Sequence, residues 1–152
     1  MITQFKIYES EYQRDKYKKY ESVPYKTISL RDILNDCKEY DIDFYTLVEE
    51  IVLNKTIAFT CFYCYDDSLE FKASPRAHEI IGKCVDIKSD PDYLKDFNIL
   101  VKIEGEEGWH ELHFIPERFQ TKFKQKVRIY NYESGELIDE LEAYKNAEKY
   151  NL

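Results

Sequence analysis

Hydrophobic positions recur at helical spacing in two consecutive segments near the start of the chain. Ser29 is the expected N-cap of the first segment, and Asp32 lies in its first turn, near the positive end of the helix dipole. Asp43 is the expected N-cap of the second, which ends at Asn54. The apolar stripes are Leu30, Ile33, Leu34 and Cys37, then Phe44, Leu47, Val48 and Ile51. We therefore expect a helical hairpin in a mainly helical region, residues 1–54.

The pattern changes over residues 56–114 to continuous apolar runs and two-residue alternation, which are typical of β-strands. Residues 57–65 (IAFTCFYCY) are predicted to form one central strand. In the next strand, alternation places Ile81, Lys83, Val85 and Ile87 on one face. The strands predicted in this region are residues 57–65, a short return at 69–72, and residues 79–88, 97–104 and 109–114. Their short, regular spacing favours a small antiparallel sheet or an SH3-like barrel.

Residues 115–152 are predicted to form a hairpin followed by a terminal helix. A strand is expected at 124–132, a turn at Ser134-Gly135, the start of a return strand at 136–139 and a helix at 142–150. The whole chain, 152 residues, fits a single domain. The predicted class is α+β: a helical hairpin packed on a small antiparallel sheet or SH3-like barrel, with a C-terminal helix.

Residues 127–151 also resemble a known unit, the opening of the modular repeat appended to homing nucleases of introns and phages. The matching positions are Ile129-Tyr130, Tyr132, residues 135–138 (GELI), Glu142, Ala147 and Lys149. The resemblance implies a hairpin followed by a helix. In that family the repeat continues into a DNA-contacting helix, which the printed sequence does not reach. Ala143 also stands where the family's helix usually has a capping serine, and we infer no DNA-binding role.

Charge limits the classes of partner. The chain has 22 basic and 30 acidic residues, for a formal net charge of −8, which is not expected of a uniformly basic nucleic-acid binder. An acidic protein that binds a basic protein surface fits better. No apolar run reaches the 18 or so residues of a membrane span, and no export signal is visible. We therefore expect a cytoplasmic protein with no membrane partner.

The acidic residues concentrate in the predicted helical hairpin, where residues 32–50 contain seven acids and one lysine. A dense acidic face can occupy a basic groove, although simple solubility is the favoured interpretation of such a face taken alone. The candidate binding residues are Asp32, Asp36, Glu39, Asp43, Glu49 and Glu50, with Glu104, Glu106, Glu107 and Glu111 expected to join them. The leading hypothesis is a non-enzymatic protein-binding module, such as a small phage-type or bacterial regulator or inhibitor. The 14 tyrosines suit a recognition surface.

The opposite charge gathers in residues 118–128 (RFQTKFKQKVR), which contain no acid. The basic residues are Arg118, Lys122, Lys124, Lys126 and Arg128; the last four alternate, so a strand would align them on one face, with Phe123 and Val127 toward the core. One interpretation is an edge strand that lysines protect from aggregation. The other is a basic stripe for phosphates, and nucleic-acid binding is the alternative function.

Cysteine and histidine supply the candidates for a zinc or other transition-metal site. The four cysteines, Cys37, Cys61, Cys64 and Cys84, are expected to be reduced. In a continuous strand, the side chains of Cys61 and Cys64 would point to opposite faces, so we predict core cysteines and no metal. A mixed site that adds Cys37, Cys84 or a histidine stays open, without support from the spacing. His110 and His113 lie three residues apart in a predicted strand, which does not match the helical zinc-protease motif.

No other pattern indicates catalysis. The sequence lacks a nucleophile elbow, a glycine-rich phosphate loop and a dinucleotide fingerprint, so we predict no enzyme and no cofactor. Asp66, Asp67 and Glu70 lie together at a predicted turn and have the oxygen ligands that a hard cation prefers. A solvated turn is the favoured interpretation.

Overall fold

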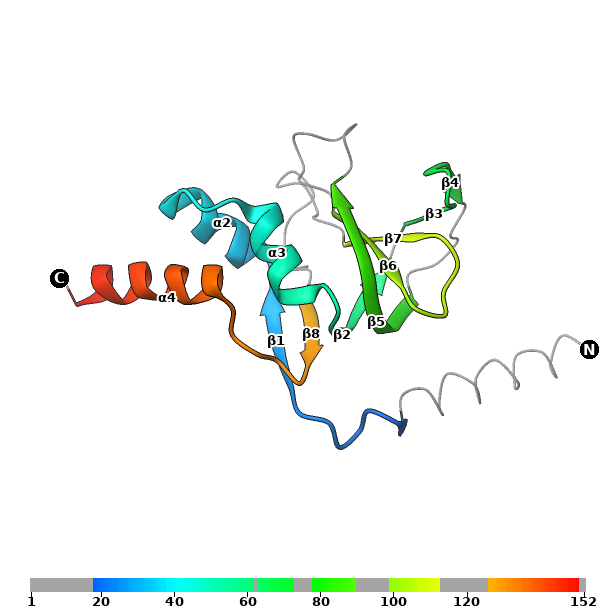
Figure 1. Ribbon diagram of the computed structural model, residues 1–152, viewed down its shortest axis with the longest axis horizontal. Helices are drawn as coiled ribbons and strands as arrows, with labels where there is room; N and C mark the ends of the chain where they lie inside the picture. Colours follow the sequence, from blue (N-terminus) through cyan, green and yellow to red (C-terminus); the bar gives the residue numbers. More distant parts are fainter. Residues whose placement is uncertain (1–17, 62, 73–77, 90–98, 113–125, 151–152) are drawn as a thin grey trace, which may run out of the picture.

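The computed structural model describes residues 18–61, 63–72, 78–89, 99–112 and 126–150. The described residues form three helices and eight strands, which confirms the α+β class. The helices lie together beside one end of the sheet, and strands β3 and β4 lie at the other end (Figure 1). The finer prediction of an SH3-like barrel remains a prediction.

Two of the three helices begin where the N-cap residues predict. Helix α2 spans Leu30–Tyr40, and the Ser29 hydroxyl accepts a hydrogen bond from the backbone N–H of Asp32. Helix α3 spans Phe44–Val52, and the Asp43 carboxylate accepts one from the N–H of Thr46 at 2.9 Å. Helix α4 spans Glu136–Lys149.

The strands form one antiparallel sheet in the order β1-β8-β2-β5-β6-β7-β3-β4. Their bounds are β1 Tyr25–Ser29, β2 Thr56–Cys61, β3 Cys64–Tyr65, β4 Phe71–Lys72, β5 His78–Ser89, β6 Ile99–Ile103, β7 Trp109–Leu112 and β8 Lys126–Tyr130. Strands β2 and β3 are consecutive in the chain, but β5, β6 and β7 lie between them in the sheet order. Strand β2 nevertheless contacts β7, the sheet neighbour of β3. The sheet therefore curls until the end of β2 lies near β3 and β7.

The main core lies between the helices and one face of the sheet. It joins apolar stripe residues of α2 and α3, such as Leu30, Leu47 and Ile51, to Ile57 of β2 and Ile129 of β8. The other face of the sheet carries a smaller cluster of Ala58, Ile81 and Tyr130, against which Tyr20 and Val23 pack. Burial of these apolar side chains is the main source of the stability of the fold.

Two local predictions are wrong, and one strand was not predicted. Residues 25–29, in the region expected to be mainly helical, form β1, which pairs with β8. Residues 136–139 begin α4 instead of a return strand. The strand expected at 57–65 ends at Cys61, and the pairing continues from Cys64 with different neighbours. In each case, pairing or packing with distant segments decides the local structure.

A β-bulge in β5 changes which of its side chains face the core, so the predicted faces of this strand are wrong. The register with β6 shifts between Cys84 and Asp86, so the alternation of side chains changes phase there. As a result Ile87, expected on the same face as Ile81, lies with Ile80 and Cys84 in the main core, whereas Ile81 packs on the other face of the sheet. A bulge cannot be found from the alternation alone, because it depends on the partner strand.

No helix within the described ranges has the length and apolar character that a membrane span requires.

Candidate functional site

Helix α4 packs against both α2 and α3, although it lies about a hundred residues further along the chain. The rings of Tyr40 and Tyr144 stack with centroids 5.7 Å apart and planes inclined by 9°. The ammonium group of Lys145 lies 3.0 Å from a carboxylate oxygen of Asp36. The hydroxyl of Tyr40 donates a hydrogen bond to Glu148, which raises the pKa of that phenol to about 12. These contacts place the acidic residues of α4 next to those of α2.

We use the name acidic helical layer for residues 30–52 and 136–149. These residues comprise twelve acids and four basic residues, a net charge of −8. The layer thus carries as much net charge as the entire chain. The sequence prediction covered only its first part, because nothing in the pattern shows that α4 packs against α2.

Three of the six predicted binding acids form a helix cap or an ion pair. Asp43 caps α3, and its hydrogen bonds with Thr46 lower the pKa of the Asp43 carboxyl. Asp36 forms the ion pair with Lys145. The Glu50 carboxylate accepts hydrogen bonds from the N–H groups of Leu137 and Ile138, at 3.0–3.2 Å, so it caps α4.

The other three predicted acids remain at the surface of the layer. Asp32 and Glu39 on α2 are exposed, and Glu49 on α3 is half-buried. A hydrogen bond with Glu49 is among the smaller causes that raise the pKa of Tyr45, after burial. Glu142 of α4 is also exposed and was not predicted as a site residue.

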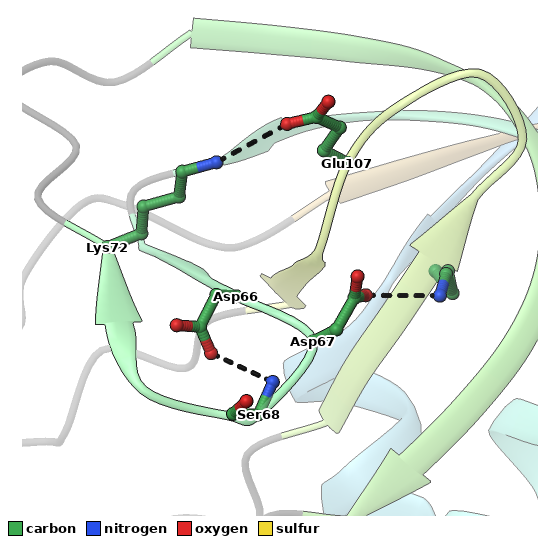
Figure 2. Close-up of polar contacts among 6 residues, drawn as sticks. Asp66, Asp67, Ser68, Lys72 and Glu107 are labelled. Carbon is green, nitrogen blue, oxygen red and sulfur yellow. Dashed lines mark hydrogen bonds and ion pairs between the residues drawn. The ribbon is translucent and has the colours of Figure 1, made fainter.

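The acids expected to join the hairpin from the strand region do not share its surface. Glu111 is buried in β7 and accepts a hydrogen bond from the Tyr65 hydroxyl at 3.1 Å, so its predicted place on an exposed face is wrong. Glu107 lies at the β6–β7 turn, where its carboxylate is 3.8 Å from the Lys72 ammonium of β4 (Figure 2). Helix α4, not this turn, extends the acidic surface.

The acidic turn at 66–70 is held by its own hydrogen bonds. One Asp66 oxygen accepts a hydrogen bond from the N–H group of Ser68 at 2.9 Å, as in an Asx-turn (Figure 2). The same oxygen accepts one from the N–H group of Glu70, also at 2.9 Å. Asp67 pairs with Lys102 at 3.2 Å. These contacts account for both aspartates within the turn, and the solvated turn stays the favoured interpretation.

Only two residues of the predicted basic stripe fall within the described structure. Lys126 and Arg128 lie on the same side of β8, while Val127 and Ile129 between and after them are buried. The Arg128 guanidinium pairs with Glu79 of β5 and lies near the rings of Tyr25 and Tyr130. Arg118, Lys122 and Lys124, with Phe123, are outside the described residues, so the nucleic-acid alternative stays a prediction.

Cys37, on the predicted apolar stripe, and Cys61, predicted as a core cysteine, both lie in the main core, and Cys84 joins them there. Cys37 lies on α2 and Cys84 on β5, and both are buried. Loss of hydration disfavours a thiolate, and burial raises the pKa of Cys37 to about 11 and that of Cys84 to about 12. Both thiols are therefore protonated at neutral pH.

Cys61 and Cys64 meet, contrary to the prediction. Because β2 ends at Cys61 and β3 begins at Cys64, the two side chains point toward each other and their sulfurs lie 3.6 Å apart. The hydrogen bond from the buried Cys61 thiol lowers the pKa of Cys64, and His110 acts in the same direction. Cys61 is buried, whereas Cys64 is half-buried.

Two histidines lie beside this pair. Cys61 is the register partner of His78 on β5, and Cys64 is the register partner of His110 on β7. The two sulfurs and a ring nitrogen of His78 all lie within 4.8 Å of one another. Sequence reasoning noted each of these residues and missed their proximity, since that depends on the curl of the sheet.

No protein-family model matches the chain, and neither a curated protein nor a solved structure matches it.

Proposed function

We propose that the protein is a non-enzymatic protein-binding module that uses the acidic helical layer to occupy a basic surface of its partner. The single observation that supports this function is the packing of α4 beside α2, which concentrates a net charge of −8 on one side of the fold. A surface of one sign speeds encounter with a complementary partner and disfavours others. A cytoplasmic regulator or inhibitor, of phage or bacterial type, would act in this way.

The composition of the layer supports recognition beyond charge. Tyr144 is 44% exposed, and its ring stacks on Tyr40, so a rigid aromatic pair lies among the carboxylates. Tyrosine adds contact area at a small cost in conformational entropy. The preferred partner is therefore a protein with a basic surface, including one whose basic groove otherwise holds nucleic acid.

The test reverses two exposed charges that have no part in the caps and ion pairs described above. The variant Glu39→Lys/Glu142→Lys changes α2 and α4, and Glu70→Lys/Glu104→Lys is the matched control, with the same change in net charge at exposed positions outside the layer. Asp36 and Asp43 are unsuitable because their substitution would also remove an ion pair or a helix cap.

We expect the tagged wild-type protein and the control to capture the same stoichiometric partner from a lysate of the native cell after nuclease treatment. The layer variant should bind it at least about tenfold more weakly, or about 1.4 kcal/mol. Equal capture by both variants would contradict the proposal. Recovery of nucleic acid, with protein partners lost after nuclease, would favour the basic stripe instead.

A further inference from the structure

The Cys61–Cys64 pair has the geometry of two ligands of one metal ion. Ligand sulfurs about 2.3 Å from a tetrahedral ion lie about 3.8 Å apart. The observed separation is 3.6 Å, whereas a disulfide would require about 2.05 Å. The ring nitrogen of His78 completes a group whose ligand atoms lie within 4.8 Å of one another. The three ligand atoms are therefore already close enough to one another to bind the same ion.

His110 provides a second and independent observation. Its side chain is 4% exposed, and its Nδ1 has no hydrogen-bond partner among the described residues. Buried polar atoms are almost always paired, and an unpaired one indicates a missing water or ion. His110 lies on β7 directly opposite Cys64 on β3. It is thus a buried imidazole beside the sulfur pair, available as a fourth ligand.

We propose that Cys61, Cys64 and His78 bind Zn²⁺, with His110 as the fourth ligand. Two thiolates and two imidazoles in a tetrahedral arrangement favour zinc over hard cations such as Mg²⁺ or Ca²⁺, which prefer oxygen. With four protein ligands, the site has no open position for substrate and is structural. This inference does not rest on the proposed function, because the cluster and the acidic helical layer are separate sets of residues.

The position of the ligands explains what such a site would do for the fold. The ligands come from β2, β3, β5 and β7, so one ion would join the strands on both sides of the curl. Strand β3 has only two residues and is held by few ladder hydrogen bonds. Zinc would therefore stabilise the end of the sheet near β3, where few backbone hydrogen bonds hold the strands together. The exposure of His78 leaves a path for the metal to enter.

The experiment uses the reduced, metal-free full chain titrated with Co²⁺, which reports tetrahedral thiolate ligands through its visible and charge-transfer absorption. We expect one Co²⁺ per chain with these bands, their loss when Zn²⁺ displaces Co²⁺, and a higher Tm with Zn²⁺ than without. His78→Gln, at an exposed position, should lower Co²⁺ affinity more than roughly 100-fold, since even outer-shell partners of ligands are worth about 10- to 100-fold. Cys64→Ser should abolish the thiolate bands.

The controls separate loss of a ligand from loss of the fold. Cys37→Ala removes a buried thiol outside the cluster and should leave Co²⁺ binding unchanged. Circular dichroism of the metal-free His78→Gln variant should match the wild type. No thiolate bands in the wild type, or wild-type affinity in His78→Gln, would overturn the site. Wild-type Co²⁺ affinity in His110→Gln would overturn the assignment of the fourth ligand.

Discussion

At the scale of the residue, burial divides the four cysteines into inert and reactive thiols. Burial raises the pKa of both Cys37 and Cys84. The negative charges of Asp36 and Asp43 raise that of Cys37 further, and a backbone hydrogen bond at Cys84 does not offset its loss of hydration. Cys64 is half-buried and lies beside a thiol donor and His110. One residue type thus has two chemistries in one small protein, and the difference comes from the surroundings of each sulfur.

These pKa values predict the order of alkylation in the folded, metal-free protein. At pH 8 a thiol of pKa about 11 is ionised in about one molecule in a thousand, and only the thiolate attacks iodoacetamide. We expect Cys64 to be labelled first, and labelling of Cys37 and Cys84 to rise only as the pH approaches their raised pKa values. Mass spectrometry of quenched samples measures the order. In urea all four should react alike; equal rates for Cys37 and Cys64 in the folded protein would contradict the assignment.

At the scale of the element, α4 receives its N-terminal cap from another helix. Its own N-cap position is Gly135, which has no side chain to accept a hydrogen bond. The Glu50 carboxylate of α3 takes that role, and a Cβ at position 135 would lie 2.3 Å from the Cδ of Glu50. Gly135 therefore makes room for the cap, where the sequence pattern indicated a hairpin turn.

Removal of the Glu50 carboxylate should loosen α4. We expect Glu50→Ala to lower the free energy of unfolding by about 1.5–3 kcal/mol, the range for hydrogen bonds to a charged group, and Glu50→Gln to lower it less because its amide oxygen still accepts. Urea unfolding followed by circular dichroism measures both. Glu39→Ala, an exposed acid of α2, is the control. If Glu50→Ala unfolds at the same urea concentration as this control, the cap does not hold α4.

At the scale of the whole molecule, repulsion among the acidic side chains lowers the stability of the fold. The acidic helical layer holds a net charge of −8 even with Lys145, which pairs with Asp36, counted among its basic residues. Like charges on packed helices repel each other, and the repulsion is strongest at low ionic strength. The repulsion therefore lowers the stability of the free protein, and a basic partner would neutralise it on binding.

Salt should therefore stabilise the free protein. The Debye length falls from about 30 Å at 0.01 M salt to about 8 Å at 0.15 M, so repulsion across the layer is screened over this range. We expect the Tm to rise with NaCl, and to rise less in Glu39→Lys/Glu142→Lys, whose layer is less acidic. Calorimetry at several salt concentrations is the measurement. A Tm that falls with salt would show that the ion pairs outweigh the repulsion.

Local patterns predicted those parts of the fold that depend on near neighbours. Ser29 and Asp43 cap the two helices as expected, because a cap needs only its own side chain and the next turn of backbone. The burial of Val127 and Ile129 follows from strand alternation. Strand β1 was missed because Tyr25–Ser29 pairs with β8, about a hundred residues further along the chain.

By itself, the sequence determined the helix caps, the apolar faces, the α+β class and the net charge, since each depends on local spacing or on composition. Tertiary structure alone decided which charges and ligands share a surface. It brought α4 beside α2 and turned Glu50 inward as a cap. It also placed His78 and His110 opposite Cys61 and Cys64. The physical reason is that strand register and helix packing depend on the whole core, which no local pattern contains.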